Sequence, residues 1–194
     1  MLFSDEEKKV KNFPEKVNKV LYRLAVNFDF YLMNNVTLII DNQTWSCSHL
    51  LISDKYVYCF DDRYFKGDLE GAIEDKKWVL YDDKTDSKEI VTNPIYNNRT
   101  RSYMLNLFLT KDPNIPLVIP VTVINNGVQL PSKVLKDSYS RNEIVHLKNL
   151  YKFIVKYEDT HDEQCFDSKD LQQTVTHIKA MSDKVRINMA KRKI

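Results

Sequence analysis

Three apolar stretches that follow one another closely place the strongest constraint on how this chain can fold. They cover residues 36–40, 45–53 and 56–61 and are rich in β-branched and aromatic residues. Asp41-Asn42 separates the first two, and Asp54-Lys55 separates the second and third. Asp and Asn favour tight turns, and connections this short join antiparallel neighbours. The region therefore predicts a meander of three antiparallel strands, whose first strand residues 30–33 can extend.

A helix is expected on each side of the meander. Ser4 with Glu7 forms a capping box, and apolar residues then recur at helical spacing to about residue 26. Pro14 interrupts this pattern and predicts a kink or a second helix start. On the other side, Asn93-Pro94 predicts the start of a helix that continues to residue 109.

The segments between and after these elements complete the predicted order. Residues 62–77 are expected to form a loop, and residues 78–81 and 89–91 a small hairpin. Residues 117–124 are almost all apolar, which is typical of a strand buried on both faces.

Two further helices are expected near the C-terminus. Ser140 with Glu143 predicts a second capping box that opens a helix through Ile154. The last helix is expected from residue 168 to 185, and the polar residues 158–164 are interpreted as a mobile linker.

The order helix, three strands, helix, strand predicts an α/β fold, because a helix that crosses to a buried strand produces a mixed sheet with helices on both faces. The expected organisation is an α/β core at residues 1–130, followed by a C-terminal helical extension at residues 131–194.

Composition narrows the class of protein. The 29 basic and 27 acidic residues give a net charge of only +2, which argues against a polycationic nucleic-acid arm. The most apolar run, residues 115–124, is too short to span a membrane and contains two prolines. The three cysteines show no paired spacing and predict reduced thiols. We therefore expect a soluble cytoplasmic protein.

Five short motifs occur in the order and spacing of one known family. They are Leu-Met-Asn-Asn-Val-Thr-Leu at residues 32–38, Ser-His-Leu-Leu-Ile-Ser at 48–53, Asp-x-Arg-x-x-x-Gly at 61–67, Trp78, and Asn93-Pro94. Over about residues 12–125, this pattern resembles the nuclease-related domain (NERD) family. The resemblance implies the PD-(D/E)XK nuclease fold, whose core order is αβββαβ. It also implies DNA or RNA as partner and phosphodiester hydrolysis with Mg²⁺ or Mn²⁺ as cofactor.

The resemblance also implies a set of catalytic residues. Asp61 stands at the glutamate of the family's E-x-K motif, and Arg63 stands at its lysine. Ser48 replaces the family's aspartate, and Glu15 matches a glutamate in the first helix. Residues two apart share a face of a strand, so Asp61 and Arg63 are expected side by side. Asp61, assisted by Glu15, would hold the metal.

The residues expected to contact the substrate are Arg63, Lys66, Asn97 and His49. Arg63 can bind a phosphate with its forked guanidinium. Asn97 takes the place of the family's helix glutamine, and Lys66 lies in the loop after Arg63. A structural role in the strand is the alternative for His49.

The departures from the family pattern leave two functions open. Ser48 offers a neutral hydroxyl where a hard dication prefers a carboxylate, and Arg63 cannot give up a proton to act as a base. One function is a metal-dependent nuclease with a weakened site. The other is a catalytically inactive module of the same fold that binds nucleic acid or a protein. A structural or assembly role has no specific sign in the sequence, and Cys47, Cys59 and His49 lack the spacing of a zinc site.

Overall fold

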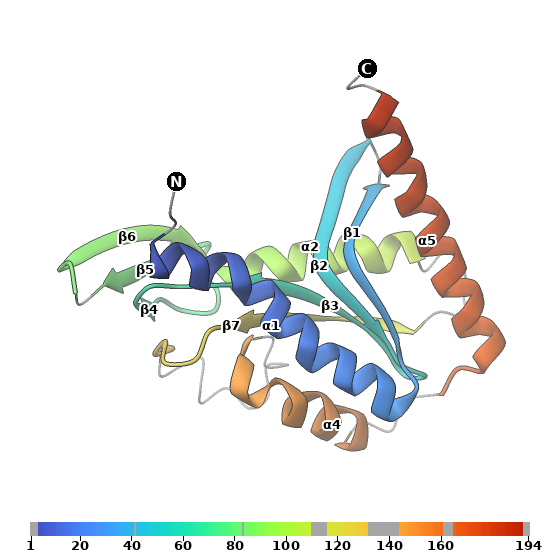
Figure 1. The fold of residues 1–194 in the computed structure, drawn as a ribbon, viewed down its shortest axis with the longest axis horizontal. Helices are drawn as coiled ribbons and strands as arrows, with labels where there is room; N and C mark the ends of the chain where they lie inside the picture. The colour runs from blue at the N-terminus through green and yellow to red at the C-terminus, as the bar shows by residue number, and fades with distance from the viewer. Residues whose placement is uncertain are drawn as a thin grey trace.

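The computed structural model describes residues 4–40, 42–82, 84–109, 116–131, 144–160 and 165–191, with side chains described to residue 185 (Figure 1). Its elements are α1 (Asp5–Phe28), β1 (Tyr31–Ile40), β2 (Gln43–Ile52), β3 (Tyr56–Arg63), β4 (Asp68–Glu70), β5 (Lys77–Asp82), β6 (Ser87–Thr92), α2 (Pro94–Leu109), β7 (Leu117–Ile124), β8 (Ile144–His146), the 3₁₀ helix η1 (Leu147–Asn149), α4 (Leu150–Thr160) and α5 (Ser168–Lys191).

The central sheet has five strands in the order β1-β2-β3-β7-β8. β1, β2 and β3 form the antiparallel meander that the sequence predicts, with Tyr31 opposite Ile52 and His49 opposite Phe60. β7 runs parallel to β3, and β8 runs parallel to β7. A second sheet of three strands, β4-β5-β6, carries the predicted hairpin. The mixed α/β fold class is thereby confirmed.

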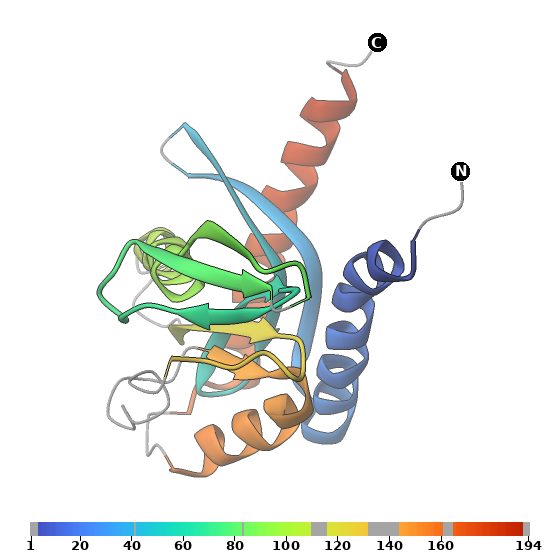
Figure 2. The same ribbon diagram turned by 90° about the vertical axis from the view of Figure 1, so that its left-hand side faces the viewer.

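Helices cover both faces of the central sheet. On one face, Leu21 of α1 and Ile154 of α4 share a core with Tyr58 and Phe60 of β3. α1 and α4 lie side by side there (Figures 1 and 2). On the other face, residues of α2 and α5 such as Leu105 and Ile178 share a second core with Val57 and Cys59. We call these the α1 face and the α2 face.

Side chains alternate between the two faces of the sheet along β3, and this alternation determines the face on which each residue at the end of the strand lies. Tyr58 and Phe60 contact the α1 face, whereas Val57 and Cys59 contact the α2 face. Successive side chains of a strand point to opposite faces. Asp61 therefore lies on the α2 face, and Asp62 lies on the α1 face.

The structure decides or corrects three local predictions. α1 continues through Pro14 as one helix, which excludes the second helix start and leaves the kink as a prediction. Pro14 is exposed, so water can solvate the carbonyl that its missing N–H leaves unbonded. Residues 68–70, expected in a loop, form β4 and pair with β5. Three residues are too few to show a strand period, so only the pairing reveals this strand.

The predicted start of the helix before residue 144 is wrong. Ile144–His146 forms β8, and the α-helix begins only at Leu150, after η1. β-Branched Ile144 and Val145 pair with the free edge of β7, which outweighs their local helical spacing. Ser140 and Glu143, and residues 161–164 of the expected linker, lie outside the described residues. Within the described part of the chain, each helix is too short or too polar to cross a membrane.

Candidate functional site

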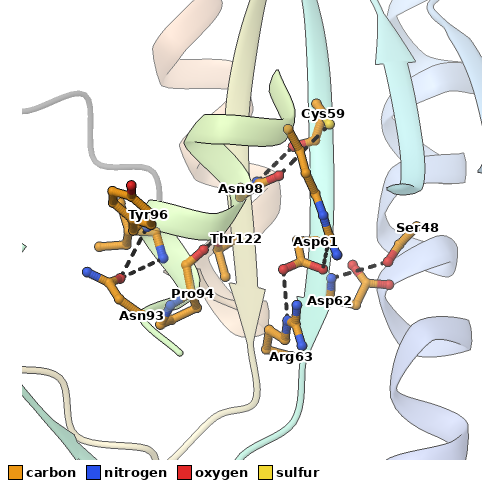
Figure 3. A network of polar contacts seen from close by, with 12 residues as sticks. Ser48, Cys59, Asp61, Asp62, Arg63, Asn93, Pro94, Tyr96, Asn98 and Thr122 are labelled. Carbon is orange, nitrogen blue, oxygen red and sulfur yellow. Dashed lines mark hydrogen bonds and ion pairs between the residues drawn. The ribbon is translucent and has the colours of Figure 1, made fainter. Parts of the chain in front are cut away.

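Asp61 and two arginines form a buried ionic cluster at the end of β3. Nε of Arg63 donates to Oδ2 of Asp61 at 2.8 Å, and Nη1 of Arg101, on α2, donates to Oδ1 at 3.1 Å. The Asp61 side chain is 8% exposed, while both arginine side chains remain about a third exposed, at 39% and 32%. Figure 3 shows Asp61 and Arg63 side by side on β3. The cluster therefore presents guanidinium groups to solvent and keeps its carboxylate inside.

Hydrogen bonds hold α2 against the sheet and so determine where Arg101 lies. The Asn98 amide donates to the carbonyl of Cys59 at 3.1 Å, and the Thr122 hydroxyl donates to the carbonyl of Pro94 at 3.3 Å (Figure 3). The indole N–H of Trp45 donates to the carbonyl of Arg101 itself at 2.7 Å. Contacts from β2, β3 and β7 therefore position the helix that supplies the second guanidinium.

Ser48 lies next to this cluster on β2. Its hydroxyl oxygen accepts a hydrogen bond from the backbone N–H of Asp62 at 3.3 Å (Figure 3). Ser48 thus links the ends of β2 and β3 at the position where the family has an aspartate. The structure brings Ser48, Asp61 and Arg63 together. The i, i+2 spacing predicts this for Asp61 and Arg63, and the family resemblance implies it for Ser48.

Glu15 is not part of this group. It lies on the outer surface of α1, where its carboxylate pairs with Lys19 at 3.1 Å and its side chain is 65% exposed. α1 covers the opposite face of the sheet from Asp61. The structure therefore does not support a metal site shared by Glu15 and Asp61.

The remaining substrate-binding candidates occupy three different environments. Asn97 is half-buried on α2, one turn before Arg101, and residues four apart are neighbours on a helix. Lys66 is exposed in the loop after β3 and lines a polar cavity. His49 is buried, and it points to the α1 face together with its register partner Phe60. Of these three residues, only Asn97 lies close to the Asp61 cluster, because it shares a face of α2 with Arg101.

His49 takes part in a buried polar chain instead. Its Nδ1 lies 2.7 Å from Oδ1 of Asn34, and its Nε2 lies 2.9 Å from Oδ2 of Asp62. The Asp62 side chain is 1% exposed, and its Oδ1 has no hydrogen-bond partner among the described residues. Burial raises the pKa of Asp62, and the hydrogen bond to His49 opposes this shift. This arrangement fits the structural alternative for His49.

Sequence reasoning missed two residues of this region, Arg101 and Asp62. Arg101 follows Asn97 by four positions, which is a signal for a shared helix face. Asp62 sits between Asp61 and Arg63 in a strand, so its side chain had to point to the opposite face. Both signals were present in the sequence, but each required the strand and helix to be placed first.

The residues present do not fit a Mg²⁺ or Mn²⁺ site. Both oxygens of Asp61 already accept hydrogen bonds from guanidinium cations, and these two positive charges oppose the binding of a metal cation. Ser48 is neutral, and Glu15 lies on the other face. Among the described residues, no three His, Cys, Asp or Glu side chains gather in a way that could hold a metal.

The thiols offer no alternative chemistry at this site. All three cysteines are free, and Cys47 and Cys59 are buried. Burial raises the pKa of the Cys47 thiol well above its ordinary value. A protonated, buried thiol is a poor nucleophile.

The arrangement suits an anion better than a cation. An arginine carries five N–H donors, so donors of Arg63 and Arg101 remain after each has bonded to Asp61. Two guanidiniums and one carboxylate leave one net positive charge, and planar guanidiniums match phosphate oxygens.

Comparison with known proteins agrees with the motifs. The model of the nuclease-related domain family, NERD, matches residues 10–125, which is more than half of the chain. Neither the curated proteins nor the solved structures contain a significant match. The matched segment begins in α1 and ends just after β7, so it contains the meander, α2 and the Asp61 cluster. The chain therefore belongs to the nuclease-related domain family.

Proposed function

We propose that this nuclease-related domain binds the phosphate backbone of nucleic acid through Arg63 and Arg101 without metal-dependent cleavage. One observation carries the proposal: guanidinium groups bond both oxygens of Asp61, the carboxylate at the position of the family's E-x-K glutamate.

Asp61 has a positioning role in this proposal. A buried carboxylate bonded to two arginines restricts their side chains to one geometry before a ligand arrives. Ligand binding then costs less side-chain entropy than binding to unrestrained arginines. The phosphate would contact the exposed edges of the guanidiniums, and Asp61 would not touch it.

Binding to a phosphate backbone predicts a strong dependence on salt. Each neutralised phosphate releases condensed counterions, so affinity falls as salt rises. Because the contacts are to phosphate, we expect little sequence preference and no effect of EDTA. A metal-bridged complex would instead weaken in EDTA.

The test combines binding and cleavage on the same samples. Fluorescence anisotropy with labelled single- and double-stranded DNA and RNA, at low salt with and without EDTA, is expected to show binding that is independent of EDTA. Incubation of the same oligonucleotides with Mg²⁺ or Mn²⁺ is expected to leave them intact. Arg63→Ala combined with Arg101→Ala should lower the affinity at least tenfold.

Arg23→Ala is the matched control, because Arg23 lies over the ring of Tyr151 on the α1 face and is remote from Asp61. It should bind like the parent protein. Metal-dependent cleavage that Asp61→Ala abolishes would establish the nuclease alternative instead. If none of the oligonucleotides binds, the proposal is overturned, and a protein-binding module is the remaining alternative.

A further inference from the structure

A polar cavity lies at the end of the central sheet that carries Arg63. β3 and β7 are parallel, and their last residues, Arg63 and Ile124, are register partners. The loops that follow these two strands line a cavity of about 400 Å³. In α/β proteins, ligands characteristically bind outside the carboxyl ends of parallel strands. The motif at residues 61–67 supplies only one of these loops, and residues 125–129 and Lys84 lie outside it.

Hydrogen bonds between the two loops form a fixed floor. The Asn125 side chain accepts from the backbone N–H of Phe65 at 2.8 Å and donates to the carbonyl of the same residue at 3.0 Å. Further along, the N–H of Leu69 donates to the carbonyl of Gln129 at 3.0 Å, and the N–H of Gln129 donates to Asp68 at 2.7 Å. The cavity is therefore formed before any ligand binds.

Three lysines reach this cavity from three separate segments. Lys9 comes from α1, Lys66 from the loop after β3, and Lys84 from the turn between β5 and β6. A Cβ at Gly67 would overlap the carbonyl oxygen of Tyr81, so only glycine lets the loop approach the hairpin this closely. This contact sets the Lys66 loop against the hairpin that carries Lys84.

α1 is attached to the same loop. The Tyr64 hydroxyl donates to Glu6 at 3.0 Å, and the Tyr64 ring packs edge-on against Phe13 at 5.8 Å between centroids. Tyr64 is thus a packing residue and is not available to stack on a base. The cavity offers recognition of charge rather than of bases.

The carboxylates that line the cavity already have partners. Glu6 accepts from Tyr64 and pairs with Lys9 at 3.3 Å. Oδ1 of Asp68 accepts from Gln129, and Oδ1 of Asp82 accepts from the N–H of Lys84 at 3.0 Å. Lys66 and Lys84 form no ion pair within 4.0 Å among the described residues, but their charges lower the pKa of Glu7 and Glu6, respectively. Both side chains are exposed, so their ammonium groups can also contact an anion in the cavity.

We infer that this cavity is a second phosphate subsite, in which Lys66 and Lys84 hold the nucleic-acid backbone next to the segment bound at Arg63 and Arg101. This inference rests on the proposed function, because it assigns the path of the same ligand. Arg63 and Lys66 are three residues apart in the chain, so one strand of nucleic acid can pass from one site to the other. The contacts recognise phosphodiester groups and predict no base preference.

The test uses the full chain with Lys66→Ala and Lys84→Ala combined. Two lost phosphate contacts should weaken oligonucleotide binding several-fold and reduce the slope of log affinity against log salt by about 2. Lys88→Ala is the matched control, because Lys88 lies on the same hairpin but over the ring of Tyr81, outside the cavity lining. It should leave affinity and slope unchanged.

The outcomes separate this inference from the proposed function. If the lysine double variant binds like the parent protein while the Arg63/Arg101 double variant does not, the subsite is wrong and the proposed function stands. If the parent protein binds no oligonucleotide, both fail. Inorganic phosphate titrated at constant ionic strength tests a free anion as the ligand. Displacement of the oligonucleotide from the parent protein, but not from the lysine variant, would show that phosphate and the nucleic-acid backbone compete for Lys66 and Lys84, as the inference expects. Phosphate binding that requires both lysines but leaves the oligonucleotide bound would assign the cavity to the free anion and overturn the inference.

Discussion

Asp61 and Asp62 are adjacent in the chain, yet they have opposite surroundings. Asp61 faces α2 and accepts hydrogen bonds from two guanidiniums. Asp62 faces α1, is bonded on one side by His49, and has a second oxygen without a partner among the described residues. The cause is the period of a β-strand, which sends neighbouring side chains to opposite faces. One carboxylate is therefore hydrogen-bonded by two guanidiniums, and the other carries a cost of burial.

The burial of Asp62 predicts that its contribution to the stability of the protein depends on pH. Burial raises the pKa of Asp62 in the folded state, so the folded protein holds this proton more tightly than the unfolded chain does. The contribution of Asp62 to stability is therefore fully present below the ordinary aspartate pKa of about 3.9 and is lost as pH rises through the folded value. Asp62→Asn cannot ionise, so its stability relative to the parent protein should improve as pH rises.

Urea unfolding of both proteins between about pH 4 and pH 8 measures this difference. Asp159→Asn, at an exposed position on α4, is the matched control and should follow the pH profile of the parent protein. Parallel profiles for Asp62→Asn and the parent protein would show that Asp62 is ionised without cost.

At the scale of elements, α2 depends on one residue at its start. The Asn93 side chain is completely buried and bonds in two directions. Its oxygen accepts from the N–H groups of Ile95 and Tyr96 at 2.9 and 3.2 Å, which caps the helix. Its nitrogen donates to the carbonyls of Ile73 and Asp75 at 2.9 and 2.7 Å, which attaches the helix to the loop before β5.

Substitutions at Asn93 are expected to separate these two roles. Asn93→Ser keeps a capping oxygen but loses both donated hydrogen bonds, so we expect a loss of about 1–3 kcal/mol in the free energy of unfolding. Asn93→Asp keeps the capping oxygen but places a second carboxylate oxygen next to the carbonyls of Ile73 and Asp75, which repel it. The free energy of unfolding should therefore fall further than in Asn93→Ser. Urea unfolding measures both, and an Asp variant as stable as the Ser variant would contradict the importance of the donated bonds.

At the scale of the whole molecule, the central sheet unites both ends of the chain. β8 pairs with β7, and Val145, Leu150, Ile154 and Tyr157 pack in the same core as α1 and β3. From the other face, Leu171 and Ile178 of α5 share a core with the meander. The division at residue 130 remains a prediction, and these contacts lead us to expect one cooperative unit.

A chain that ends at residue 130 tests this expectation. Val145, Leu150 and Ile154 each bury a side chain worth about 1.5–3 kcal/mol, and a domain has a net stability of only about 5–15 kcal/mol. The shortened chain should therefore lack a cooperative urea transition, while the full chain shows a single one. Circular dichroism during unfolding measures both. A cooperative transition in the shortened chain would demonstrate an independent core at residues 1–130.

The sequence by itself determined the helices and strands of the core and their order, but not β4 or β8. Capping pairs, turn residues and apolar spacing act within a few residues, so Ser4–Glu7, the meander, the helix after Asn93 and the strand at residues 117–124 were all predictable. The i, i+2 spacing of Asp61 and Arg63 was equally readable, because it depends on strand geometry alone.

Only the tertiary structure decided which of these elements meet. β8 exists because the edge of β7 was free to pair, and no local pattern describes that edge. Arg101 is 40 residues from Asp61, and they meet only because α2 packs across β3. Glu15 lies far from the site for the same reason, since α1 packs on the other face of the sheet. Contacts between distant segments follow from packing two faces of one sheet, which residue spacing does not record.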